Sequence, residues 1–154
     1  MKILQFKSQP FSIPFMKSLK NAKGQYDNRE GFWLKIVSEN FVGFGEAAPL
    51  PGFSMESLEE VYYVFEGFFH AVKNENLDEE ELLLLAEVHC GNCPSARFAV
   101  ETAIYDILSK KINTSMSKYL NKSSSSSIEV NGMVGAHVAS DGYKVLKVKV
   151  GLSN

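Results

Sequence analysis

Two lysines near the end of the chain have the spacing that most suggests chemistry. Leu146, Lys147, Val148, Lys149 and Val150 alternate apolar and cationic side chains, as a β-strand does when successive side chains leave opposite faces. Lys147 and Lys149 would then share one face. Neighbouring cations disfavour each other's charge and burial disfavours it further, so a lysine in such a setting can take and return a proton near neutral pH. The alternative is an exposed edge strand whose lysines prevent aggregation.

A stiff loop is the second candidate for function. Residues 48–54 read Ala-Pro-Leu-Pro-Gly-Phe-Ser, in which two prolines and a glycine restrict the backbone while Leu50 and Phe53 remain apolar. A rigid loop that carries apolar side chains often closes over a ligand. The alternative is that both side chains fill the local core.

A Cys-x-x-Cys pair, Cys90 and Cys93, directly precedes a helix predicted to start at Pro94. Helix N-termini lower the pKa of thiols, and this arrangement occurs in thioredoxin-like redox sites. No βαβ pattern surrounds the pair, and a zinc site would need two further ligands, of which His89 supplies at most one. We therefore interpret both cysteines as structural residues.

The elements that would position these groups begin with an antiparallel meander. The apolar and turn patterns predict strands over residues 2–15, 31–38 and 41–47, with a tight turn at Glu39-Asn40. The polar, glycine-containing segment 19–30 is interpreted as a mobile loop.

Helices follow the stiff loop. Ser57 begins a capping-box pattern, and apolar residues then recur at three- and four-residue steps to Val72. Acidic residues from Asp78 start a second helix that runs to about Val88, and Pro94 starts a third that ends near Lys111, with alanines that permit close packing. A short helix is expected over residues 115–120.

Five consecutive serines, residues 123–127, are interpreted as a solvated linker between domains. The expected organisation is a domain over residues 1–122, this linker, and the start of a second domain over residues 128–154. The second part is predicted to contain a short strand at residues 128–132 and then the lysine strand.

Composition narrows the class of protein. The chain is 45% hydrophobic and 22% charged with a formal charge of −2, so it should fold around a core and is not expected to bind nucleic acid. No apolar run approaches a membrane span and no signal peptide is evident, so we expect no membrane association. Two cysteines suit a reducing cytoplasm.

Four segments together resemble the o-succinylbenzoate synthases, dehydratases of menaquinone biosynthesis in the muconate-lactonizing-enzyme-like part of the enolase superfamily. They are residues 43–54, 94–101, 130–132 and 147–151. The resemblance implies an α+β capping domain, a three-stranded meander with a helical bundle, followed by the first strands of a TIM-like (β/α) barrel that is incomplete in this chain. It also implies that these 154 residues alone are inactive.

The resemblance further implies roles for single residues. Lys149 would remove the proton alpha to the carboxylate of a small-molecule substrate, with Lys147 beside it. Gly52, Phe53 and Ser54 would close over the substrate. A divalent metal, usually magnesium, would be held by residues beyond Asn154, so no metal ligand is assigned here.

Two other functions stay open at this point. One is another enolase-superfamily reaction on the same scaffold, N-acylamino acid racemisation or dipeptide epimerisation. The other is a non-catalytic α+β binding module, which would fold on its own with the lysine strand facing water.

Overall fold

The computed structural model describes residues 1–21, 24–134 and 142–148. The chain divides into two units, Met1–Lys122 and Ser123–Asn154. Among the described residues, no helix is both long enough and apolar enough to cross a lipid bilayer.

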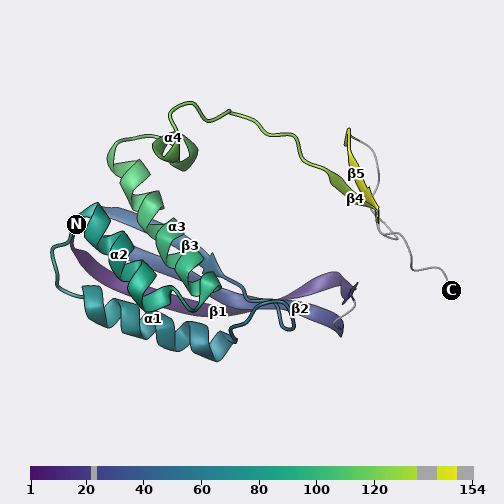
Figure 1. The fold of residues 1–154 in the computed structure, drawn as a ribbon, viewed down its shortest axis with the longest axis horizontal. Helices are drawn as coiled ribbons and strands as arrows, with labels where there is room; N and C mark the ends of the chain where they lie inside the picture. Colours follow the sequence, from purple (N-terminus) through teal and green to yellow (C-terminus); the bar gives the residue numbers. More distant parts are fainter. Residues whose placement is uncertain (22–23, 135–141, 149–154) are drawn as a thin grey trace. The chain divides into compact units, whose positions relative to one another are not determined.

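The first unit contains a three-stranded antiparallel sheet in the order β1-β2-β3 (Figure 1). Its strands are β1 (Ile3–Asn21), β2 (Gly24–Ser38) and β3 (Phe41–Ala47). The turn at Glu39-Asn40 joins β2 to β3, and the pair Ser38↔Phe41 closes this hairpin. The predicted meander is confirmed, and β3 has the predicted bounds.

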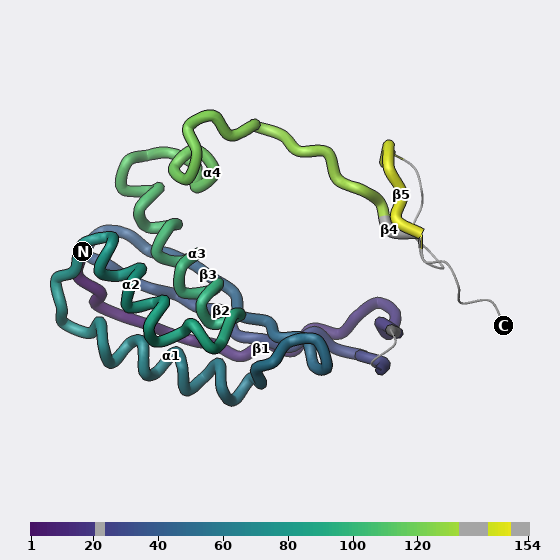
Figure 2. The backbone as a smooth tube through the Cα atoms, in the orientation of Figure 1, coloured from purple at the N-terminus to yellow at the C-terminus, as the bar shows by residue number. Residues whose placement is uncertain are grey.

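The prediction of a mobile loop over residues 19–30 was wrong. Residues 19–21 and 24–30 continue β1 and β2 as a two-stranded ribbon, in which Leu19 pairs with Tyr26 and Lys20 with Gln25. An irregularity in register lies between Pro14 and Leu19. Main-chain pairing does not depend on apolar side chains, and a ribbon with both faces largely in water shows no hydrophobic alternation. We call residues 14–21 and 24–30 the β-arm; Figure 2 shows it extending past the helices.

Four helices follow the sheet: α1 (Leu58–Val72), α2 (Glu79–Cys90), α3 (Pro94–Lys111) and α4 (Met116–Leu120). The capping box of α1 forms between Ser57 and Glu60, and that of α2 between Asp78 and Glu81. Each side chain satisfies a backbone N–H that the first helical turn leaves without a partner. The four predicted helices are confirmed, although α2 runs two residues further than expected.

The core lies between the helices and one face of the sheet. The sheet contributes Leu34 and Ile36, both fully buried, and the apolar stripe of α1 contributes Phe65 and Phe68. The ring of Phe6 on β1 packs on Phe65 edge to face with centroids 5.7 Å apart. The aromatic stripe of α1 is therefore core, as its spacing predicted.

Helix α3 lies against β3 with almost no space between the two backbones. Gly43 and Gly45 face this helix, and a Cβ built on either would lie 2.0 Å from a carbonyl oxygen of α3, that of Ala103 or Ala99 respectively. Small residues on both sides are required for this approach.

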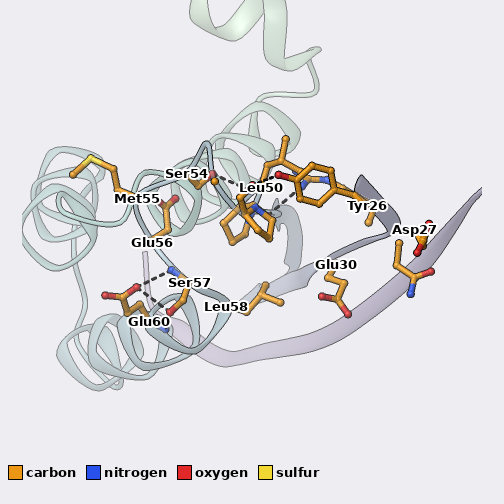
Figure 3. Close-up of a pocket in the computed structure, with 15 residues that line it drawn as sticks. Tyr26, Asp27, Glu30, Leu50, Ser54, Met55, Glu56, Ser57, Leu58 and Glu60 are labelled. Atoms are coloured by element: carbon orange, nitrogen blue, oxygen red, sulfur yellow. Dashed lines mark hydrogen bonds between the residues drawn. The ribbon is translucent and has the colours of Figure 1, made fainter. Parts of the chain in front are cut away.

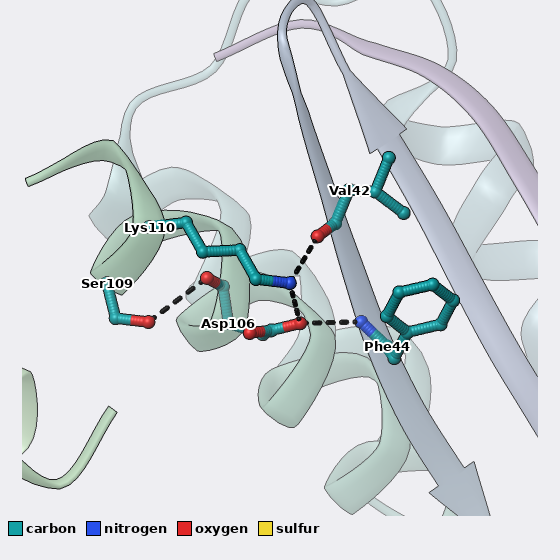
Figure 4. Close-up of polar contacts among 5 residues, drawn as sticks. All are labelled: Val42, Phe44, Asp106, Ser109 and Lys110. Atoms are coloured by element: carbon teal, nitrogen blue, oxygen red, sulfur yellow. Dashed lines mark hydrogen bonds and ion pairs between the residues drawn. The ribbon is translucent and has the colours of Figure 1, made fainter. Parts of the chain in front are cut away.

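Polar groups of α3 also cover the free edge of β3 (Figure 4). The Asp106 carboxylate accepts a hydrogen bond from Phe44 N at 3.1 Å, and the Lys110 ammonium donates to Val42 O at 2.8 Å. Asp106 and Lys110 form an ion pair at 2.7 Å. Backbone groups that could pair with another strand are thus occupied from within the chain.

The second unit contains β4 (Gly132–Val134) and β5 (Leu146–Val148), which pair in parallel with Gly132 opposite Leu146. The bounds predicted for the first of these strands, residues 128–132, were wrong: β4 begins at Gly132, the last residue of that range, and residues 128–131 are not in a strand. The β5 side chains are all exposed. A parallel pair with uncovered apolar side chains fits the opening strands of a (β/α) barrel.

Candidate functional site

A hollow of about 580 Å³ lies between the β-arm and the loop that leads from β3 to α1 (Figure 3). Its walls are residues 26–30 of the arm and residues 49–52, 54–58 and 60 of the loop and the start of α1. Its size is within the range of small-molecule sites. All of these residues belong to the first unit.

Two of the three predicted substrate residues line this hollow. Gly52 and Ser54 are in its wall, whereas Phe53 is not in the lining and is 60% exposed. Gly52 has φ +77°, a left-handed conformation that favours glycine. The Ser54 hydroxyl accepts a hydrogen bond from Leu50 N at 2.9 Å, and Ser54 N donates to Leu50 O at 2.8 Å. The turn over Gly52 is therefore closed by its own residues.

Sequence reasoning missed two residues that hold this loop. The Arg29 guanidinium donates to the carbonyl oxygens of Ala48 and Pro49, the latter at 3.2 Å. The Tyr26 hydroxyl donates to Pro51 O at 2.6 Å. The prediction of a mobile loop over residues 19–30 gave no reason to expect these contacts. Arg29 and Tyr26 have fixed positions because they lie in β2, which pairs with β1.

Three carboxyl groups in the wall, those of Asp27, Glu56 and Glu60, have a lowered pKa. Hydrogen bonds from serine and glutamine side chains of the arm lower the pKa of Asp27. Burial of Glu56 acts to raise its pKa, but hydrogen bonds, led by those from Ser95, outweigh burial and lower it. Hydrogen bonds from the backbone and side chain of Ser57 lower the pKa of Glu60. None of these three groups holds a proton that it could donate near neutrality, so none of them can act as a general acid at that pH.

The structure describes one of the two predicted catalytic lysines. Lys147 lies in β5 opposite Met133 of β4, with its side chain exposed. Lys149 lies outside the described residues. The roles of Lys147 and Lys149 therefore stay predictions.

The cysteines are buried. Cys90 is 0% exposed and Cys93 is 3% exposed. Burial raises the pKa of the Cys90 thiol to about 12 and also raises the pKa of Cys93. A redox thiol at a helix N-terminus would have a lowered pKa, so the shift supports the structural interpretation.

We expect the native thiols to resist alkylation. With its pKa at about 12, Cys90 should react with iodoacetamide at pH 8 more than about 100-fold slower in native protein than in urea, because only the thiolate is nucleophilic. Mass spectrometry of timed samples measures both rates. Equal rates in native and denatured protein would show that the thiol is exposed and not structural.

The described residues do not fit a metal centre. No group of three or more His, Cys, Asp and Glu side chains within residues 1–21, 24–134 and 142–148 is arranged to hold a metal ion.

Comparison with known proteins identifies relatives of the chain. It is 27% identical over 143 residues to the o-succinylbenzoate synthase of Yersinia pseudotuberculosis serotype I (strain IP32953), an alignment that covers 92% of this chain and 40% of the relative. The chain thus spans about 40% of the length of that curated relative.

Solved structures share the fold. The dipeptide epimerase from Enterococcus faecalis V583, complexed with Mg and the dipeptide L-Leu-L-Tyr, matches with a TM-score of 0.82 at 23% identity, over 98% of this chain and 46% of the epimerase. The 2-chloromuconate cycloisomerase from Rhodococcus opacus 1CP matches with a TM-score of 0.78 at 19% identity, over 100% of this chain and 46% of the cycloisomerase. The α+β capping domain followed by the start of a barrel is therefore confirmed.

The sequence profile of one family matches residues 5–107, which hold the three-stranded sheet, the hollow and most of the helices. This segment is more than half of the chain. The chain belongs to the family described as MenC, N-terminal domain.

Proposed function

We propose that the full-length protein is an o-succinylbenzoate synthase, a lyase of menaquinone biosynthesis. It would dehydrate 2-succinyl-6-hydroxy-2,4-cyclohexadiene-1-carboxylate to o-succinylbenzoate. The observation that carries this proposal is the family match over residues 5–107. The Yersinia relative, whose name is that of the same enzyme, supports it.

In this reaction Lys149 is the base. Its neutral amine takes the proton on the carbon alpha to the carboxylate and becomes an ammonium group. The electron pair of that C–H bond forms the new ring double bond as the C–O bond breaks, and the departing hydroxyl group takes the proton back from Lys149 and leaves as water. Lys147, two residues earlier in the sequence, would influence the charge and position of Lys149. The parallel pairing of β4 and β5 supports this assignment, since barrel enzymes carry catalytic groups at the C-terminal ends of parallel strands.

Gly52, Phe53 and Ser54 would contact the substrate and exclude water from it. Gly52 and Ser54 already line the hollow, and Phe53 extends from the same turn as an exposed apolar group. We propose Mg²⁺ as the divalent metal of the reaction; within the part of the chain that the structure describes, no group of three or more His, Cys, Asp and Glu side chains is arranged to hold it. The Mg in the dipeptide epimerase structure supports the choice of ion.

A second candidate function is dipeptide epimerisation or N-acylamino acid racemisation. The TM-score of 0.82 to the Enterococcus epimerase is the observation that favours it. Both reactions begin with removal of a proton alpha to a carboxylate, and a shared fold does not decide between them. The third possibility, a non-catalytic binding module, has less support, because enzymes of one superfamily match nearly the whole chain.

The test is turnover by the full-length protein. We expect purified protein to convert the cyclohexadiene carboxylate to o-succinylbenzoate, detected by chromatography against an authentic standard. Prolonged treatment with EDTA should reduce the rate by at least about 100-fold, and added MgCl₂ should restore it. Absence of product from metal-loaded protein would contradict the proposal, and full activity after chelation would contradict its metal requirement.

A further inference from the structure

We propose that Arg29 and Tyr26 are positioning residues that hold the 48–56 loop against the β-arm, so that the arm sets where Gly52, Phe53 and Ser54 lie. This inference rests on the proposed function for its consequence in catalysis. Its structural part, that the arm restrains the loop, stands independently of the reaction.

The contact between arm and loop is made by side chains of the arm and backbone of the loop. Arg29 places its two terminal nitrogens on two consecutive carbonyl groups, those of Ala48 and Pro49. Two residues further along the loop, Pro51 O accepts the hydrogen bond from Tyr26. Three carbonyls within four residues are thus held by one strand, and the planar guanidinium fork fixes the orientation as well as the distance.

The other end of the loop is held by the helices. The Glu56 carboxylate accepts a hydrogen bond from Ser95 N, in the first turn of α3, at 2.8 Å. Ser57 caps α1. Loop movement is therefore restrained on both sides of the turn that carries Phe53.

Between these two attachments the loop exposes its side chains. Phe53 is 60% exposed and Met55 is 95% exposed, although the backbone around them is hydrogen-bonded. Exposed apolar groups on a restrained backbone lose little freedom when they cover a ligand, so they lower the entropic cost of binding. Releasing the restraint should therefore weaken substrate binding more than it slows the chemical step.

The experiment uses full-length protein with the substitutions Arg29→Lys, Tyr26→Phe and Phe53→Ala, and the double variant Arg29→Lys/Phe53→Ala. Lysine keeps the charge but lacks the fork that spans two carbonyls. Arg97→Lys is the matched control, because the ion pairs of Arg97 are with Glu101 of α3 at 2.6 Å and Glu87 of α2 at 3.8 Å. Amide hydrogen exchange by mass spectrometry and steady-state kinetics are measured for each variant, together with the melting temperature.

In Arg29→Lys we expect exchange in residues 49–56 to accelerate about 10-fold or more while α1 to α3 keep their protection. KM for the cyclohexadiene carboxylate should rise about 10-fold with kcat changed less than about 3-fold. Tyr26→Phe should show a smaller effect in the same direction, and Arg97→Lys none. The KM effects of Arg29→Lys and Phe53→Ala should be less than additive, because Arg29 acts through the position of Phe53.

Two results would overturn the inference. Unchanged exchange in residues 49–56 would show that Arg29 does not restrain the loop. Exchange accelerated across all helices as well would show that Arg29 stabilises the whole fold and has no specific role in the loop. If the wild-type protein does not turn over the precursor, the proposed function fails, but the exchange result still decides whether the arm holds the loop.

Discussion

Replacement of Lys149 by alanine in the full-length protein should abolish dehydration, with kcat reduced by at least about 1,000-fold. A positioned general base contributes on the order of 10²–10⁴ in rate, and an alanine side chain offers no group that can accept the proton. Lys149→Arg should be equally inactive, since a guanidinium stays protonated at any working pH and cannot act as a base. The rate of o-succinylbenzoate formation measures both.

Lys144→Ala is the matched control in the same segment. The Lys144 side chain is 80% exposed and pairs with Glu129 at the surface, so its loss should cost little stability and leave kcat unchanged within about 2-fold. Unchanged melting temperatures would show that all three variants are folded. An active Lys149→Ala protein would remove this lysine from the mechanism.

The Gly45→Ala substitution should have the largest effect on stability. The added Cβ would lie 2.0 Å from Ala99 O and 2.7 Å from Ala99 C, and both are backbone atoms that cannot rotate away. Strand β3 and helix α3 would have to separate across the core. We expect a loss of about 3 kcal/mol or more in the free energy of unfolding, at the upper end of overpacking effects. Urea unfolding followed by circular dichroism measures it.

Gly67→Ala provides the control of opposite sign. Gly67 is exposed on α1, and nothing lies within 4 Å of the Cβ it would gain. Alanine in a helix interior is favoured over glycine by about 1 kcal/mol, so this variant should be more stable than the wild type. Equal stability of Gly45→Ala and Gly67→Ala would contradict the close approach of α3 to β3.

The helical part of the fold could be predicted from sequence because its signals are local. The capping box at Ser57, the acidic start at Asp78 and the proline at Pro94 each mark a helix start without information from elsewhere in the chain. The apolar spacing of α1 likewise identified Phe65 and Phe68 as core residues. Such patterns predict where a single helix begins and which of its faces is buried.

The β-arm and its contacts could not be predicted in the same way. Its strands pair through the backbone with polar residues on both faces, so no periodic pattern separates a paired ribbon from a loop. The bonds from Arg29 and Tyr26 end on carbonyl oxygens, which every residue carries. The residue types in the 48–56 loop therefore do not indicate that its carbonyl groups bond to Arg29 and Tyr26.

The lysine strand shows a different limit. The alternating pattern around Lys147 correctly indicated a strand, now described as β5, but a strand pattern does not say which neighbours will cover it. All β5 side chains are exposed because β5 pairs only with β4 in a two-stranded sheet, and no further described element covers its faces.

The most direct test of the account compares kcat/KM of the full-length, magnesium-loaded protein for three substrates side by side. They are the cyclohexadiene carboxylate, an N-succinyl amino acid and a dipeptide such as L-Leu-L-Tyr. The account predicts that the first is preferred by at least about 100-fold, because the substrate that the site is built for gains the most transition-state binding. Faster epimerisation of the dipeptide, or faster racemisation of the N-succinyl amino acid, than dehydration would contradict it.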